Sequence, residues 1–127
     1  MQTDQFVAHV YESCPQLAPD VVHQCTLITL DSLCEQLPKD QTKRMAEQLP
    51  DEIADAVRAG GDRAETSYVP ISLDEFYGKI CFRTELDMED AQQLVSGVVS
   101  ALEKALDDGE VEGVKLDLPS ELDQLMQ

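Results

Sequence analysis

Apolar residues recur along this chain three and four positions apart, which is the spacing of one face of an α-helix, and no segment alternates convincingly as a strand does. The pattern predicts a first short helix around Phe6 and Val10. A longer helix follows Pro19, a residue suited to a first helical turn. Two short helices complete the run, one over about residues 39–48 and one opened by Pro50. The apolar stripe of the long helix consists of Val22, Cys25, Leu30, Leu33 and Leu37.

The same order of apolar positions returns about 70 residues later, which is the signature of an internal repeat. The long helix of this second copy carries the stripe Ala91, Leu94, Val98, Leu102 and Leu106. The aligned pairs include Phe6 with Phe76, Val10 with Ile80, Leu30 with Val99, and Leu49-Pro50 with Leu118-Pro119. We therefore divide residues 1–127, taken as one helical domain, into repeat one (6–57), a connecting segment (58–71) and repeat two (72–126).

The predicted fold is all-α: a compact bundle of about eight helices, built from two tandem four-helix repeats with a pseudo-twofold relation. Because a half of about fifty residues is marginal alone, we expect the two repeats to share one core. Ser72 and Glu75 have the spacing of a capping box, and Asp87 suits an N-cap. Gly60 and Gly61 are expected to end repeat one as a helix C-cap. The apolar residues that follow, up to Ile71, are expected to pack along the bundle.

Three features of the repeats resemble a known family: the phenylalanine of the first helix (Phe6, Phe76), the leucine pair Leu30-x-x-Leu33, and the segment Ala46-Glu-Gln-Leu-Pro50. The chain resembles the domain-of-unknown-function 2267 family of bacteria. Repeat two departs from the last signature, because it reads Lys115-Leu-Asp-Leu-Pro119. The resemblance covers most of the chain. It implies the helical fold and carries no activity with it.

The chain is strongly acidic, with 26 Asp and Glu against 9 Lys and Arg and a formal net charge of -17. Such a charge argues against nucleic acid and anionic membranes as partners. Residues 72–127 hold 14 acidic and 4 basic residues, whereas residues 1–59 hold 10 and 4. This asymmetry predicts that repeat two docks on a protein partner with a basic surface. The candidate partner-binding residues are Glu89, Asp90, Asp107, Asp108, Glu110 and Glu112, with Tyr68 and Pro70 as an apolar anchor.

No catalytic, cofactor-binding or metal-ligating residue is assigned. The chain has two histidines, and no Ser-His-Asp or Cys-His arrangement can be argued from their spacing. Residues 108–113 begin like an EF-hand calcium loop, with oxygen-bearing side chains at alternate positions and Gly113 sixth. The twelfth position is Pro119, where the calcium loop needs a bidentate glutamate, so a calcium site is disfavoured.

Four cysteines are present, and none forms a C-x-x-C pair, so free thiols are expected. Cys34 aligns with Glu103 of repeat two and Cys14 aligns with Thr84, which makes both of them candidate exposed thiols. The acidic neighbours Asp31 and Glu35 would raise the pKa of the Cys34 thiol, so an incidental thiol is favoured over a redox role. The remaining hypothesis is that Cys34 reacts with a thiol reagent in the folded protein.

Together these observations predict a non-enzymatic, acidic helical protein that acts by protein–protein interaction. The alternative is a bundle that binds a small ligand or a divalent cation as a sensor. The N-terminal residues lack the basic and apolar regions of a signal peptide, so a cytoplasmic location is expected. We expect no cofactor, and self-association stays open.

Overall fold

The computed structural model describes residues 1–67 and 71–126. Within them lie α1 (Thr3–Tyr11), α2 (Pro19–Cys34), α3 (Lys39–Glu47), α4 (Asp51–Ser67), α5 (Leu73–Thr84), α6 (Met88–Ala105), α7 (Asp108–Asp117) and the 3-10 helix η1 (Ser120–Met126). No strand occurs in this part of the chain. The predicted all-α fold is confirmed, and the predicted caps at Ser72 and Asp87 are both formed.

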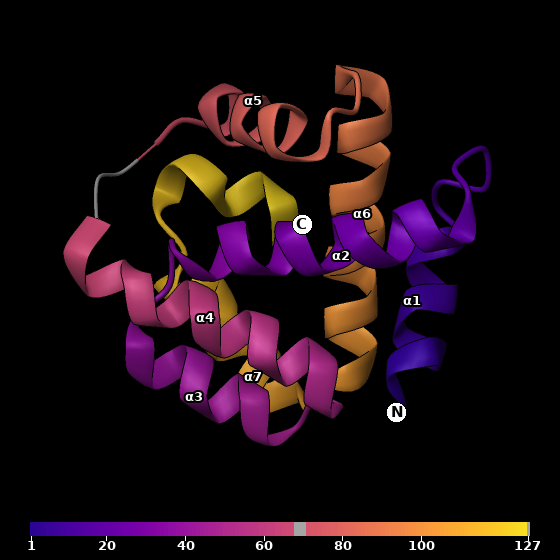
Figure 1. The fold of residues 1–127 in the computed structure, drawn as a ribbon. Helices are drawn as coiled ribbons and strands as arrows, with labels where there is room; N and C mark the ends of the chain where they lie inside the picture. The colour runs from indigo at the N-terminus through magenta and orange to yellow at the C-terminus, as the bar shows by residue number, and fades with distance from the viewer. Residues whose placement is uncertain (68–70, 127) are drawn as a thin grey trace.

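The long helices α2 and α6 cross in the middle of the molecule, and the other helices pack around this crossing (Figure 1). The first helix of each half contacts the long helix of the other half, because α1 packs on α6 and α5 packs on α2. On the other side of α2, α4 packs against both α2 and α3, and α7 contacts α3. The pseudo-twofold relation of the two halves stays a prediction.

Both predicted apolar stripes are buried along their whole length. Phe6 and Phe76, the two phenylalanines that the repeat aligns, are fully buried. One hydrophobic cluster runs through both halves, from Phe6 to Met126. Each leucine buried in it contributes roughly 1.5–3 kcal/mol of transfer free energy, so this shared cluster is a main source of the stability of the fold.

Gly60 and Gly61 do not end a helix, so the predicted C-cap at these residues is wrong. Helix α4 continues through both glycines, and neither has a positive φ. A Cβ atom on Gly60 would overlap the Asp31 carbonyl oxygen and lie 2.9 Å from Cys34 Cβ, and one on Gly61 would overlap Thr42. The two glycines therefore let α4 lie close to the backbone of α2 and to the Thr42 side chain of α3.

The longer α4 explains why the prediction of an exposed thiol at Cys34 is wrong. Cys34 is 0% exposed and lies under Gly60. The prediction is wrong for Cys14 as well, because its side chain is 0% exposed and its thiol donates to the Val10 carbonyl. Burial, and to a lesser extent the charge of Asp31, raises the pKa of the Cys34 thiol well above its usual range. The alignment with Glu103 failed because the last helix of repeat two, η1, is much shorter than α4.

None of the helices in the described ranges combines the length and the apolar character that crossing a membrane requires.

The close approach of α4 to α2 can be tested with a pair of glycine substitutions. Gly60→Ala should lower the free energy of unfolding by about 1–3 kcal/mol, because the Asp31 backbone would have to move. Gly78→Ala on α5 is the matched control, since a Cβ there meets no atom within 4 Å. It should raise stability by up to about 1 kcal/mol, because alanine favours a helix more than glycine does. Urea unfolding followed by circular dichroism measures both values, and a Gly60→Ala protein as stable as wild type would contradict the packing.

Thiol accessibility gives a second test of the fold. Cys14, Cys25 and Cys34 are buried, whereas Cys81 is half-buried. We expect one thiol to react with a chromogenic disulfide reagent in the native protein and all four to react in denaturant. Cys81→Ser should remove the native reaction. Rapid modification of Cys34 in the folded chain would show that α4 does not cover it.

Candidate functional site

One side of α5 is exposed along its whole length. Asp74, Glu75, Gly78, Phe82 and Glu85 follow one another at helical spacing, and all are exposed. Phe76 and Ile80, on the opposite side of the helix, are buried. The Phe82 side chain is 87% exposed, the most of any large hydrophobic residue in the described chain. Gly78 precedes Phe82 by one turn and has open space around it, so no side chain there covers the ring.

The inner side of α5 carries the basic residues, which are bound to carboxylates of α2. Lys79 Nζ lies 2.5 Å from Glu35 Oε2, and Arg83 Nη1 lies 2.8 Å from Asp31 Oδ1. Arg63 of α4 forms ion pairs with both carboxylates. We call Asp31, Glu35, Arg63, Lys79 and Arg83 the ion-pair cluster. The side chains of Asp31 and Glu35 are 14% and 11% exposed, so this cluster is partly shielded from water.

The cluster is strong enough to reverse the effect of burial on its acids. Burial alone would raise the pKa of Asp31, but hydrogen bonds from Arg63 and Arg83 hold it below its ordinary value. Glu35 behaves in the same way with Arg63 and Lys79. Both basic residues of α5 are thus engaged in ion pairs with α2, and the outer side of the helix carries the exposed Asp74, Glu75 and Glu85.

The chain turns from α5 into α6 through a conformation that is costly for its sequence. Glu85 has φ 63° and ψ 19°, the left-handed region, and it is the one non-glycine residue with positive φ in the described chain. Its N–H donates to the Cys81 carbonyl at 2.9 Å, which closes the end of α5. Glycine usually occupies this position of a helix end. A glutamate there costs roughly 1–2 kcal/mol, so its presence calls for a reason other than stability.

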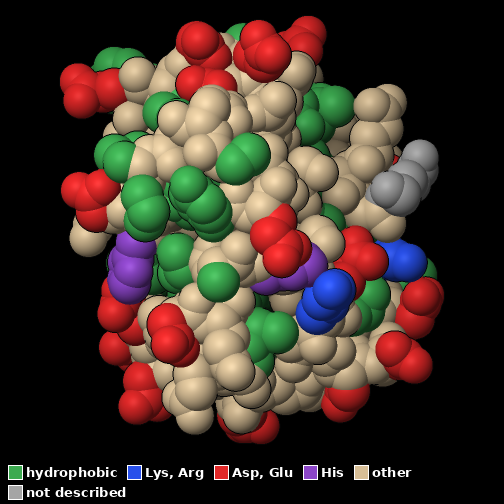
Figure 2. All heavy atoms as spheres, turned by 90° about the vertical axis from the view of Figure 1, so that its right-hand side faces the viewer, with side chains coloured by type: hydrophobic (Ala, Val, Ile, Leu, Met, Phe, Trp, Pro, Cys, Tyr) green, Lys and Arg blue, Asp and Glu red, His purple; other side chains and the backbone are tan. Residues whose placement is uncertain are grey.

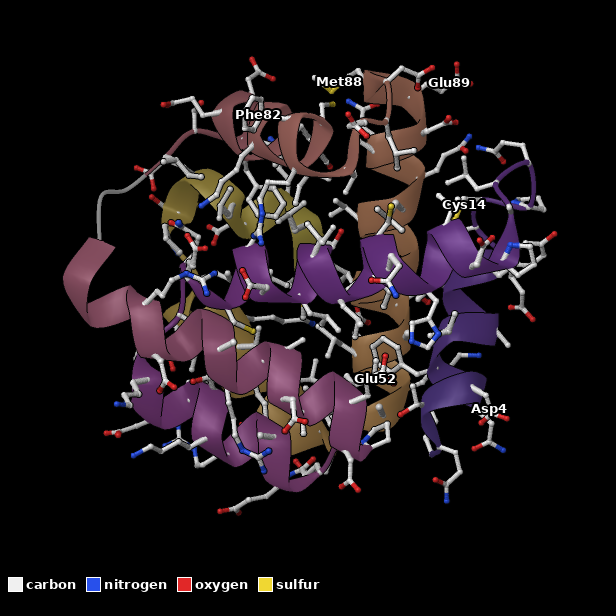
Figure 3. The ribbon with its side chains drawn as sticks, in the orientation of Figure 1. Asp4, Cys14, Glu52, Phe82, Met88 and Glu89 are labelled. Atoms are coloured by element: carbon white, nitrogen blue, oxygen red, sulfur yellow. The ribbon has the colours of Figure 1, made fainter. Side chains whose placement is uncertain are left out.

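Beyond the turn, the first residues of α6 extend the exposed surface. Met88 is 44% exposed, and Glu89 is exposed beside it. Phe82, Met88 and Glu89 lie at the same end of the molecule (Figure 3). We call Phe82 and Met88, together with the carboxylates of Asp74, Glu75, Glu85 and Glu89, the α5 surface. It combines two apolar side chains with four negative charges.

Phe82 was not among the residues singled out from the sequence, although a signal for it was present. Phe76 and Ile80 define the buried side of the helix, and Phe82 lies off that side by its spacing. A large aromatic residue on the polar side of an amphipathic helix is uncommon enough to mark a candidate anchor. The left-handed conformation of Glu85 left no comparable sign in the sequence.

The six acidic residues predicted as one docking face lie at two ends of α6. Glu89 and Asp90 are in its first turn, whereas Asp107 and Asp108 follow its last residue. An 18-residue helix spans roughly 27 Å, so a small contact does not include both groups. Of the six, Glu89 alone belongs to the α5 surface.

Several of these carboxylates have partners inside the molecule. Asp90 Oδ1 accepts from Gln16 Nε2 at 2.7 Å. Asp107 caps α7 and also accepts from Gln48 Nε2 at 3.0 Å. Glu110 accepts from Gln41 and lies 3.5 Å from Arg44 Nε, and so joins α7 to α3.

The remaining predicted site residues do not belong to the α5 surface. Asp108 is exposed, and Glu112 is exposed with Lys115 Nζ at 3.7 Å. Tyr68 and Pro70 lie outside the described residues, so the predicted apolar anchor there is not tested. In the described part of the chain, no three His, Cys, Asp or Glu side chains converge as metal ligands would.

Comparison with curated proteins finds no match to this chain. The sequence model of one family, described as an uncharacterized conserved protein (DUF2267), matches residues 3–125. The match extends over both halves and nearly the whole length, as the resemblance of the repeats predicted. The chain therefore belongs to the DUF2267 family of uncharacterised conserved proteins.

Proposed function

We propose that this protein acts without catalysis, by binding another protein through the α5 surface. The observation that carries the proposal is Phe82, an 87% exposed aromatic ring on a helix whose inner side is fixed by the ion-pair cluster. Burying such a side chain in a partner contributes roughly 1.5–3 kcal/mol. Aromatic residues on fixed supports are typical centres of protein interfaces.

The surroundings of Phe82 indicate what kind of partner fits. Met88 adds a second, flexible apolar side chain at the same end of the molecule, and the exposed carboxylates of α5 and of the start of α6 supply charged residues of the kind found at the rim of an interface. The complementary surface is an apolar pocket bordered by Lys or Arg. A second copy of this chain is a poor partner, because four carboxylates would face four others.

The conformation of Glu85 supports the same proposal. Glu85 places a negative charge at a strained position, where glycine would give a more stable fold. Attraction of a basic partner is a reason for such a charge, since exposed charges mainly speed encounter and select partners.

The proposal predicts a specific loss of binding in Phe82→Ala. Affinity capture from the source cell supplies the partner, and titration calorimetry with the purified partner measures its affinity. Phe82→Ala should weaken binding about 30-fold, which corresponds to roughly 2 kcal/mol. Leu116→Ala is the matched control, because Leu116 is 83% exposed but lies on α7. It should bind as wild type does.

Added salt should weaken the same complex, since exposed charges are screened over about 8 Å at physiological ionic strength. An affinity that does not depend on salt would argue against the α5 surface. An equal loss of partner binding in Leu116→Ala and Phe82→Ala would do the same.

Two substitutions of Glu85 can distinguish its effect on partner binding from its effect on the stability of the fold. Glu85→Gly should raise the free energy of unfolding by about 1 kcal/mol, because glycine adopts the left-handed conformation without strain. The same change should weaken partner binding, because a carboxylate is lost from the α5 surface. Glu85→Gln keeps the strain and removes the charge, so it should weaken binding without the gain in stability. If Glu85→Gly unfolds more easily than wild type, the turn is not strained in the way described.

A further inference from the structure

A second surface, which the proposed function does not use, lies between α1 and the first turns of α2. It is a groove with a volume of about 1080 Å³. Figure 2 views the molecule from this side and shows hydrophobic side chains gathered between acidic ones. The groove is lined by Gln2, Thr3, Asp4, Val7, Ala8 and Tyr11 on one wall and by Pro19, Asp20, His23 and Gln24 on the other.

The sequence of α1 explains why the helix has a free side. Phe6 and Val10 are fully buried, and α1 packs on α6. Asp4, Ala8 and Tyr11 follow one another at helical spacing on another side and line the groove. At one end of the helix the Tyr11 hydroxyl donates to the Pro15 carbonyl at 3.2 Å, which holds the ring beside the loop.

The charge of the groove has one sign. Asp4 and Asp20 stand on opposite walls, and the ten lining residues include no Lys or Arg. His23 donates to Glu52 at the start of α4, which brings a third carboxylate next to the lining. An occupant that covers the apolar walls must therefore also bring positive charge to these acids.

We infer that this groove binds a short amphipathic helix of a partner protein, with Lys or Arg flanking its apolar side. A helix satisfies its own backbone hydrogen bonds, whereas an extended segment would need partners that the walls, themselves helices, do not offer. Helix α1 has nine residues, a length of roughly 13 Å, which matches between two and three turns of a bound helix.

Two other occupants fit less well. A second copy of this chain brings a net charge of -17, and two cations of its basic helix α3, Lys39 and Arg44, are already paired with Asp62 and Glu110. A small ligand is usually enclosed over most of its surface. This groove is partly open to solvent, as a helix-binding groove is.

The groove and the α5 surface are separate sites, so one can fail without the other. Asp4 and Phe82 lie at different ends of the molecule (Figure 3). A protein with both would hold two partner segments at once.

The test uses a fluorescent synthetic peptide of about four helical turns, with leucines at helical spacing and lysines elsewhere. Fluorescence anisotropy measures its affinity for the full chain. Ala8→Arg, which puts a bulky cation into the groove, should weaken binding at least about tenfold. Ala59→Arg is the matched control, since it adds the same side chain at an exposed position of α4 outside the groove. Ala59→Arg should change the affinity for the peptide by less than about twofold. Because both substitutions add one positive charge to the protein, the comparison removes any effect of net charge.

Further readouts make the outcome unambiguous. A peptide with glutamate in place of lysine should not bind, and Phe82→Ala should bind the lysine peptide as wild type does. Amide chemical shifts in α1 and the start of α2 should change on titration. Equal losses in Ala8→Arg and Ala59→Arg, or shift changes confined to other helices, would reduce the binding to general attraction by an acidic protein and overturn the inference.

Discussion

Asp31 and Glu35 take two negative charges into a place where little water reaches, and the positions of α4 and α5 follow from that. A carboxylate withdrawn from water without a partner costs several kcal/mol, so these two acids require the cations that surround them. Arg63 comes from α4, and Lys79 and Arg83 come from α5. The paired charges, together with the buried Phe76 and Ile80, fix which side of α5 faces outward. The exposure of Phe82 is a consequence of this orientation, because the cations and Phe82 lie on different sides of one helix.

The overall negative charge has more than one origin. Asp87 and Asp107 cap helices, while Asp90 and Glu110 bind side chains from other elements. Carboxylates of this kind serve the fold, and a helix N-terminus favours them electrostatically. Of the carboxylates of the α5 surface, Glu75 also serves the fold through the capping box with Ser72, whereas Asp74, Glu85 and Glu89 are exposed. Net charge alone therefore overstates how much of the acidity is free to act on partners.

Much of the architecture could be predicted from the spacing of apolar residues. Both stripes of the long helices are buried as predicted, because a period of 3.6 residues specifies a face without knowledge of the partner helix. Gly60 was misread because glycine serves equally as a helix end and as a point of close approach, and the packing of α4 decides between the two. Cys34 was misread for the same reason, since its neighbour is a residue of α4.

The functional surfaces were harder to reach from the sequence. Phe82 could have been found from its place on the polar side of its helix, but the conformation of Glu85 and the groove between α1 and α2 depend on how helices meet in space. The six acidic residues that the sequence predicted as one docking face do not form a single surface, because the length of α6 separates them into two groups.

The ion-pair cluster also sets how the molecule responds to acid. Both carboxylates have a pKa below the ordinary value when folded, so their contribution to stability is complete above about pH 5 and is lost as the pH falls through the folded values. Protonation would break the ion pairs of Arg63 on α4 as well as those of Lys79 and Arg83 on α5. Acid would thus loosen both α4 and α5 from α2, while the apolar contacts between the helices carry no charge to lose.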